Sequence, residues 1–358
     1  MARISITCGT ENATIRYTTN GSEPTEASGV YSSPFIAEGI TVKAKGFKSG
    51  LAPSAVASKA IPQENPVSWT TVSIGTTVNL FEAAYGNGRF VLVGNGVIFY
   101  STDGKTWTQA TQPLTGYIYS VAFGNGRFVT CGMSSASDRA TQIAYSTDGV
   151  TWTAVSQSVV PKWGQRIGFG AGKFVISGWN TSNKTAMAYS TDGVTWYPCT
   201  FSGLTRYAYS FAFGAGKFIV CNGGGGQAYS TDGVTWTTIT DNFRNAGLSS
   251  AQNIAYGNGL FVATNPSGGA AYSTDGITWA TFTQSRLSNI YASFFGYGKF
   301  LFGGISSDGS GKYTIAYSRN GTTWQATLPA YGTKIGGFAY GNGRFVLVGS
   351  SGLVAYNG

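Results

Sequence analysis

The sequence of 358 residues predicts an all-β protein: a seven-bladed β-propeller preceded by a small β-sandwich. One segment, YSTDGVTW or a close copy, occurs six times, and a second motif of the type AYGNGRFVLVG occurs seven times. The aromatic residues that lead the second motif are 38, 46, 44, 43, 39 and 45 residues apart, a period typical of propeller blades. These leading residues are Tyr85, Phe123, Phe169, Phe213, Tyr256, Phe295 and Tyr340.

Each repeat predicts four strands. The first strand ends in the aromatic lead, and a GNG or GAG turn joins it to an apolar second strand such as RFVLVG. A variable segment leads to a third strand, AYS, and a TDG turn leads to a fourth strand, TWT. Because side chains alternate between the faces of a strand, the Tyr and Trp of these strands are expected to pack between neighbouring blades.

The tryptophans predict how the ring closes. Six repeats end in Trp, but a seventh Trp, in SWTTV at 68–72, has no repeat before it. The last repeat ends in GLVAYNG at 352–358 and has no Trp after it. We expect the N-terminal strand at 68–72 to complete the last blade, because a ring closed in this way leaves no open sheet edge.

The repeated hairpin resembles the Asp box of sialidase-like, BNR-type propellers, Ser-x-Asp-x-Gly-x-Thr-Trp, with one residue fewer between Asp and Gly. In that family the box is structural and lies away from the substrate face. The resemblance therefore implies a turn-forming role, rather than catalysis or metal binding, for the residue at this position of each copy. These residues are Asp103, Asp148, Asp192, Asp232, Asp275 and Asn320.

Residues 1–61 differ from the repeats. The segments YTTNGSEPT at 17–25 and YSSPFIAEGITVKAKGFKSGLAPSAVAS at 31–58 resemble the small immunoglobulin-like module at the C-terminus of chitobiase and hexosaminidase. The resemblance implies an accessory β-sandwich without catalytic residues. The stretch PQENPV at 62–67 predicts a linker, and 68–358 is the predicted propeller.

The acidic residues argue against an enzyme. There is no histidine, and every glutamate lies at or before Glu82. Apart from the turn residues, the propeller keeps Asp138, Asp241 and Asp308, whereas most glycosidases need two carboxylates that flank one bond. The four cysteines lack metal-like spacing, and we expect buried free thiols at Cys131 and Cys221. The sequence thus predicts no catalysis, no cofactor and no metal.

The net charge of +9 reflects few acids rather than runs of Lys and Arg, which argues against nucleic-acid binding. No stretch has the length of a membrane span, and the first residues lack the apolar core of a secretory signal.

The loops that differ between repeats are expected on one face of the propeller, because the near-invariant GNG and TDG turns share the other. Binding residues concentrate on loops held by a rigid scaffold, although loops also drift where nothing constrains them. Aromatic rings stack on sugars and Arg pairs with carboxylate or phosphate, so we predict an anionic surface glycan as ligand; a protein partner is an open alternative. The candidate ligand-binding residues are Arg166, Arg206, Arg244, Arg286, Lys334, Tyr117, Trp163, Trp179, Tyr207 and Tyr291, and the same loops carry Arg139, Lys184, Lys312, Phe243, Tyr313 and Tyr331.

Propellers of this repeat type joined to a chitobiase-like module resemble bacteriophage tail, fibre or head-decoration proteins. That resemblance implies a non-enzymatic virion protein, assembled in the host cytoplasm, whose N-terminal module contacts other virion proteins. A bacterial carbohydrate-binding propeller protein and a degenerate sialidase-like glycosidase are the alternatives.

Overall fold

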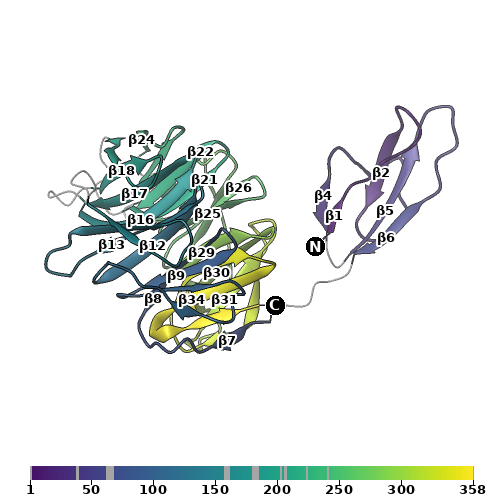
Figure 1. The fold of residues 1–358 in the computed structure, drawn as a ribbon. Helices are drawn as coiled ribbons and strands as arrows, with labels where there is room; N and C mark the ends of the chain where they lie inside the picture. Colours follow the sequence, from purple (N-terminus) through teal and green to yellow (C-terminus); the bar gives the residue numbers. More distant parts are fainter. Residues whose placement is uncertain are drawn as a thin grey trace. The chain divides into compact units, whose positions relative to one another are not determined.

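The computed structural model describes residues 2–37, 40–61, 68–156, 162–179, 185–201, 204, 208–222, 225–239 and 242–357. The chain divides into two compact units, Met1–Val67 and Ser68–Gly358 (Figure 1). The division falls where the predicted propeller begins, and the predicted linker at 62–67 lies outside the described residues.

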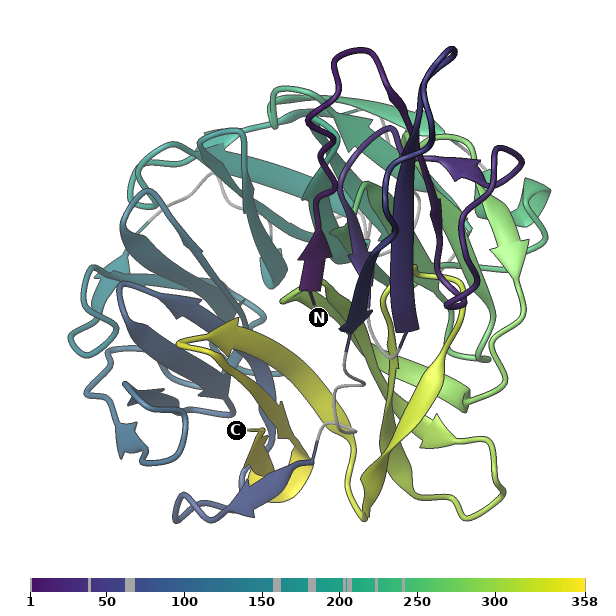
Figure 2. The ribbon, with the colours of Figure 1, turned by 90° about the vertical axis from the view of Figure 1, so that its right-hand side faces the viewer.

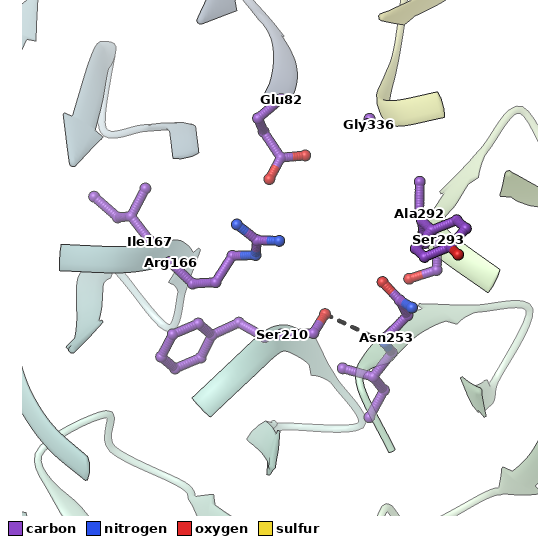
Figure 3. A pocket seen from close by; sticks show the side chains of 12 residues that line it. Glu82, Arg166, Ile167, Ser210, Asn253, Ala292, Ser293 and Gly336 are labelled. Atoms are coloured by element: carbon purple, nitrogen blue, oxygen red, sulfur yellow. Dashed lines mark hydrogen bonds between the residues drawn. The ribbon is translucent and has the colours of Figure 1, made fainter. Parts of the chain in front are cut away.

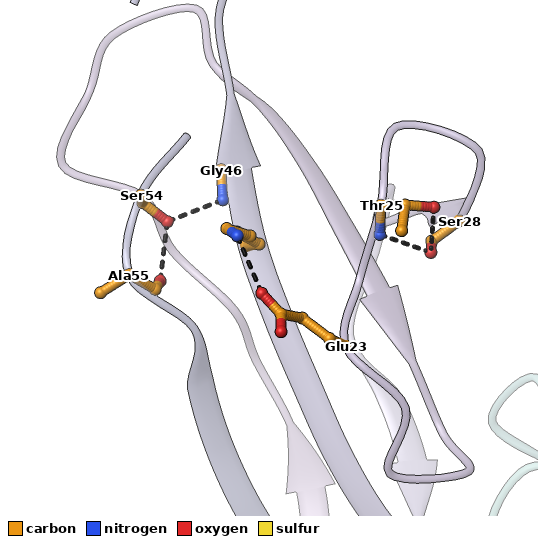
Figure 4. A network of polar contacts seen from close by, with 7 residues as sticks. Glu23, Thr25, Ser28, Gly46, Ser54 and Ala55 are labelled. Carbon is orange, nitrogen blue, oxygen red and sulfur yellow. Dashed lines mark hydrogen bonds and ion pairs between the residues drawn. The ribbon is translucent and has the colours of Figure 1, made fainter. Parts of the chain in front are cut away.

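The first unit is a small all-β body with two sheets. Its strands are β1 (Ala2–Ile4), β2 (Thr14–Thr18), β3 (Gly29–Val30), β4 (Phe35–Ala37), β5 (Ile40–Phe47) and β6 (Ala57–Ile61). β1 pairs with β4, and the other sheet has the order β3-β2-β5-β6 around a core of Ile4, Val42 and Ile61. Polar contacts join its strands and loops, among them an ion pair of 3.0 Å between Lys45 Nζ on β5 and Glu23 Oε1, drawn as the dashed line from Glu23 in Figure 4.

The second unit is built from antiparallel sheets whose strands follow one another in the chain. These are β8 (Leu80–Gly86), β9 (Arg89–Gly94), β10 (Ile98–Ser101) and β11 (Thr108–Gln109); β12 (Tyr117–Gly124), β13 (Arg127–Met133), β14 (Thr141–Ser146) and β15 (Thr153–Val155); β16 (Lys162–Gly170), β17 (Lys173–Trp179), β18 (Thr185–Ser190) and β19 (Tyr197–Pro198); β21 (Ala208–Gly214), β22 (Lys217–Asn222), β23 (Gln227–Ser230) and β24 (Thr235–Ile239); β25 (Asn253–Gly257), β26 (Leu260–Thr264), β27 (Ala270–Ser273) and β28 (Ala280–Phe282); β29 (Leu287–Gly296), β30 (Lys299–Ser306), β31 (Tyr313–Ser318) and β32 (Gln325–Tyr331); and β33 (Ile335–Gly341), β34 (Arg344–Gly349) and β35 (Val354–Tyr356) with β7 (Thr70–Val72).

The first strands of these sheets form a closed ring. β8 packs against β12, β12 against β16, and so on through β21, β25 and β29 to β33, which packs against β8. Figure 2 shows the sheets of this unit arranged around a common centre. The second unit is therefore a β-propeller, as predicted.

The predicted closure of the ring is confirmed by the pairing of β7 with β35. Val72 lies opposite Val354 and Thr70 opposite Tyr356, in antiparallel register. The side chain of Trp69, just before β7, is buried with its ring centroid 6.4 Å from that of Phe338 and 6.5 Å from that of Phe345. An N-terminal strand thus completes the sheet formed by the C-terminal strands.

Neighbouring blades touch through a glycine at the end of six of the seven inner strands. A Cβ atom at Gly86 would overlap the ring of Phe123, and one at Gly341 would overlap the ring of Tyr85, so the last blade makes the same contact with the first. Gly124 with Phe169, Gly170 with Phe213, Gly214 with Tyr256 and Gly257 with Phe295 repeat it. Glycine is required here because the aromatic lead of the next blade occupies the space of any side chain.

The near-invariant turns also join neighbouring blades. Asn87 donates from Nδ2 to the carbonyls of Gly126 (3.0 Å) and Thr147 (2.9 Å), and Arg89 Nη1 donates to the carbonyl of Asp148 (2.6 Å). Equivalent bonds from Asn125, Arg127, Asn258, Asn342 and Arg344 recur around the ring. Both kinds of turn therefore lie on one face, which we call the turn face; the opposite one is the loop face.

Within each TDG turn, the Ser and Asp side chains form hydrogen bonds with each other and with backbone N–H groups of the same turn. Ser101 Oγ donates to Asp103 Oδ1 (2.9 Å) and accepts the Gly104 N–H (2.8 Å), and Asp103 Oδ1 accepts the N–H groups of Lys105 and Thr106 at 2.8 Å each. The other copies repeat this pattern, with Asn320 Oδ1 in the sixth. The structure thus gives these residues turn-stabilising bonds, the role predicted for them.

The sequence did not predict three local features. A short helix, α1 (Asn242–Asn245), and a 3₁₀ turn, η1 (Ser350–Gly352), interrupt the β-structure, and β20 (Thr200–Phe201) adds a parallel fifth strand beside β24. In most blades the fourth strand begins after the Trp rather than including it, as β11 does after Trp107.

Removal of β7 should destabilise the propeller. Deleting residues 1–75 exposes the edge of β35 and empties the site of Trp69. Deleting residues 1–67 leaves β7 and Trp69 in place. We expect the shorter protein to melt more than about 10 °C below the longer one, because losing a buried Trp alone costs about 3–5 kcal/mol. Differential scanning calorimetry makes the comparison, and equal melting temperatures would contradict this account of closure.

A methyl group at the closing glycine should also destabilise the ring. Gly341→Ala places a Cβ atom inside the ring of Tyr85, and we expect it to lower the free energy of unfolding by about 2–3 kcal/mol. Gly332→Ala is the control, because its Cβ would meet no atom within 4 Å, and it should stay within about 0.5 kcal/mol of the parent protein. Urea unfolding of both variants measures the difference. Similar unfolding midpoints would show that the contact between Gly341 and Tyr85 does not exclude a larger side chain.

Candidate functional site

Two adjacent cavities lie on the propeller axis toward the loop face. The outer chamber, of about 350 Å³, is lined at the starts of inner strands, by Phe81, Tyr119, Trp163 and Lys334 among others. The inner chamber, of about 100 Å³, lies further along the same strands. Both are lined by Arg166, Tyr291 and Gly336, so together they form one site of two chambers.

One repeated position builds the inner chamber. It stands three residues before the aromatic lead and is occupied around the ring by Glu82, Ser120, Arg166, Ser210, Asn253, Ala292 and Gly337. In six blades the ladder between the first two strands shifts register immediately before this position. Such bulges re-aim a side chain, and here they direct different side chains toward one axis.

Most of the polar side chains in this ring are held by the next blade. Ser120 Oγ donates to Glu82 Oε2 (3.4 Å) and accepts the Ile167 N–H (3.2 Å). The Ile254 N–H donates to Ser210 Oγ (3.2 Å), the bond drawn as the dashed line from Ser210 in Figure 3, and Asn253 Nδ2 donates to the carbonyl of Ile290 (3.1 Å). These contacts fix the chamber walls before any ligand arrives.

Glu82 is the acidic group of the inner chamber. Burial raises its pKa to about 7, while the positive charge of Arg166 and the hydrogen bond from Ser120 lower the pKa by less. Its carboxylate and the Arg166 guanidinium both point into the chamber (Figure 3), but these two described side chains do not form an ion pair at 4.0 Å or less. A polar group of a ligand can therefore meet both.

Aromatic rings form one wall of the outer chamber. The ring of Tyr119 lies 5.3 Å from that of Phe81, 5.6 Å from that of Tyr117 and 6.4 Å from that of Trp163. Trp163 in turn lies 4.8 Å from Trp179. A continuous aromatic wall of this kind suits stacking against a sugar ring or another flat apolar surface.

Trp163 is held in an unusual backbone conformation. Its φ is +50°, that of Arg139 is +54°, and the Trp163 N–H donates to the carbonyl of Arg139 (2.9 Å). The Arg139 guanidinium also lies 5.0 Å from the centre of the Trp163 ring. Left-handed backbone costs energy in residues other than glycine and concentrates at functional sites. This pair therefore marks the chamber wall as a candidate ligand-binding surface.

Positive charge borders the chambers. Lys334 Nζ lies 4.2 Å from the centre of the Tyr291 ring, and Arg166 lies on the boundary between the chambers. Protein packed around the Lys334 ammonium lowers its pKa, and the positive charge of Arg166 lowers it further. Two cations that repel each other across a cavity favour a shared anion.

The structure brings together part of the predicted set. Trp163, Arg166, Tyr291 and Lys334 line the outer chamber, and Tyr117 and Trp179 extend its aromatic wall.

Other predicted residues lie elsewhere. Arg244 on α1 lies beside Gly225, and Arg286 Nε donates to the carbonyl of Trp324 (3.3 Å), so these two described residues do not line the chambers. Arg206, Tyr207 and Lys184 lie outside the described residues. The inclusion of Phe243 and Tyr331 among loop aromatics was wrong, because both side chains are buried.

The sequence reasoning missed Glu82, Tyr119 and the ring of positions that contains Glu82. Aligning the repeats on the aromatic lead would have found the ring, since five of its seven positions hold polar residues that differ in type or charge between repeats.

Within the described ranges, no group of three or more His, Cys, Asp or Glu side chains could hold a metal ion. The four cysteines are free, and burial raises the pKa of the Cys221 thiol to about 12. None of the helices in the described part of the chain is long and apolar enough to cross a membrane.

Comparison with known proteins identifies the first unit and the fold of the second. Residues 2–58 match the family described as "Chitobiase/beta-hexosaminidase C-terminal domain", so the chain carries this domain at its N-terminus. No curated protein matches the chain.

Three solved structures share the propeller fold. YCF48 bound to D1 peptide is 15% identical over 82% of this chain and 97% of its own, with a TM-score of 0.63. Virginiamycin B lyase from Staphylococcus aureus is 10% identical over 81% of this chain and 99% of its own (TM-score 0.65). The WD40 β-propeller domain of Doa1 is 14% identical over 82% and 97% (TM-score 0.60). At such identities the likeness shows the fold alone.

The acidic groups should give the protein a stability maximum in mildly acidic solution. Because the pKa of Glu82 is raised from 4.5 to about 7, the folded state holds the proton more tightly, and stability falls as pH rises from about 4.5 through 7. The turn aspartates act in the opposite sense. Burial raises the pKa of Asp103 and Asp275, but hydrogen bonds from backbone N–H groups and from neighbouring Ser and Thr side chains together lower it to about 2, so stability falls as these carboxylates are protonated below about pH 4.

Glu82→Gln tests this assignment. We expect it to raise the free energy of unfolding by about 2 kcal/mol at pH 8 and to have little effect at pH 5. Urea unfolding at the two values measures the effect, and an equal change at both would contradict the raised pKa.

Proposed function

We propose that the protein is a non-enzymatic structural and binding protein of a bacteriophage virion, in the tail, a fibre or the capsid decoration, and that its propeller recognises an anionic host-surface glycan at the two chambers. The single observation that carries the binding proposal is the outer chamber: an aromatic wall and the cations Arg166 and Lys334 surround one cavity of about 350 Å³. That volume is within the range of small-ligand sites.

The chemistry of this cavity suits an acidic sugar. The rings of Tyr119 and Trp163 offer flat apolar surface to the face of a sugar ring, and the two cations can pair with a carboxylate or phosphate. The walls come from several blades, and the ring of glycine–aromatic contacts holds those blades at fixed positions. Such a preformed site avoids part of the entropic cost of binding.

The virion assignment rests on the resemblance of the repeats, together with the chitobiase-like domain, to phage tail, fibre and head-decoration proteins. In this proposal the propeller has seven blades of Asp-box type, supported by the seven aromatic leads and the ring of inner strands. The first unit is an immunoglobulin-like sandwich that contacts other virion proteins, supported by its two sheets.

Glycan binding is tested with a paired substitution in the outer chamber. Trp163→Ala with Lys334→Ala removes an aromatic surface and a cation, and we expect affinity for acidic polysaccharides to fall about ten- to a hundredfold. The dependence of binding on salt should also weaken, because screening acts on the lost charge pairing. A glycan array with carboxylate-bearing, phosphate-bearing and neutral polymers measures both.

The matched control is Tyr197→Ala with Lys105→Ala, an exposed aromatic residue and an exposed cation that do not line the described chambers. It should bind like the parent protein. If the chamber variant also binds acidic polymers like the parent at every salt concentration, the chambers are not the glycan site. Mass spectrometry of purified phage particles tests the virion assignment separately.

A further inference from the structure

The inner chamber contains opposite charges that do not touch. Glu82 reaches it from β8 and Arg166 from β16, and each is aimed inward by the bulge before it. Figure 3 shows the guanidinium directed toward the carboxylate across the cavity. A stable internal ion pair would close this gap, so the gap itself is the feature to explain.

Arg166 is fixed in place but keeps donors for a ligand. Its Nε donates to the carbonyl of Tyr209 (2.9 Å) and its Nη1 to the carbonyl of Gln165 (3.1 Å). Among contacts with described residues these use two of the five N–H donors of a guanidinium, which leaves three. A positioned guanidinium binds carboxylate and phosphate through paired hydrogen bonds.

Few charged groups face Glu82. Besides Arg166 from β16, the titratable neighbour is the buried thiol of Cys131 on β13, whose pKa burial raises. From β12 comes the Ser120 hydroxyl, and Lys334, ahead of β33, borders the outer chamber. The arginines of the other strands packed on β8, Arg89 of β9 and Arg344 of β34, bind carbonyls of the turn face instead.

We propose that the inner chamber binds the anionic group of a ligand, carboxylate or phosphate, at Arg166, and that Glu82 takes up one proton from solvent when it does so. The inference rests on the proposed function and deepens it: the glycan would present an acidic end group to the axis rather than lie across the face. The proton adds to a carboxylate oxygen of Glu82, and no bond of the ligand is made or broken.

Proton uptake is expected because the chamber is small. A ligand anion and an ionised Glu82 would place two negative charges in about 100 Å³, where solvent screening is weak. Protonation removes the repulsion and makes Glu82 a hydrogen-bond donor to the ligand. Burial already brings the pKa of Glu82 to about 7, so little further change is needed for proton uptake at neutral pH.

Titration calorimetry of the full-length protein tests this coupling. The probes are D-glucuronate for the carboxylate, dimethyl phosphate for a phosphate that stays ionised, and D-glucose as the neutral control, each from pH 6 to pH 9. We expect affinity for the preferred anion to fall up to about tenfold per pH unit above 7, with uptake of up to one proton measured in buffers of different ionisation enthalpy. Glucose should bind at least tenfold more weakly.

Two variants make the result specific. Glu82→Gln should bind the anion with little dependence on pH and no proton uptake, and Arg166→Gln should lose at least tenfold in affinity at pH 6; thermal melting verifies that both are folded. The same pH dependence in Glu82→Gln and the parent protein would overturn the proposal. If the parent binds acidic polysaccharide but neither small anion, this inference fails while the proposed function stands; if it binds a small anion but no polysaccharide, the proposed function fails.

Discussion

The contact between the aromatic lead of one blade and a glycine of the previous blade is the constraint on which the rest of the propeller depends. At Gly86, Gly214 and Gly341 alike, the neighbouring ring fills the place of a side chain. The contact sets the distance between inner strands, and because Gly341 meets Tyr85, it links the end of the ring to its beginning. The strand β7, donated from before the first repeat, completes the same closure at the outer edge.

This constraint separates structural from functional residues. The Asn and Arg side chains of the turn face bind carbonyls of the next blade, so their repetition serves assembly of the ring. The position three residues before each aromatic lead is under no such demand for one residue type, and it holds Glu82, Arg166 and Asn253 among others. A ring of equivalent positions on one axis allows unlike side chains to converge, which a single blade could not achieve.

Much of the fold could be predicted from the sequence because the same pattern of strand and turn residues occurs in every repeat. The spacing of the leads predicted the strands, and the unpaired Trp69 predicted which strand would complete the last sheet. The site was harder, because its residues come from different blades and meet only through ring closure. Glu82 was noted only as the last glutamate of the chain, and Phe243 was misplaced because a short helix buries it. Arg244 and Arg286 were grouped with residues far from them in the fold.

We propose that ligands bind on the propeller axis and not on the outer loops. A crystal structure of the protein soaked with an acidic oligosaccharide tests this assignment. The assignment predicts electron density for a sugar against Trp163 in the outer chamber, with its carboxylate or phosphate at Arg166. Well-defined sugar density beside Arg244 or Arg286, with both chambers holding only solvent, would contradict it.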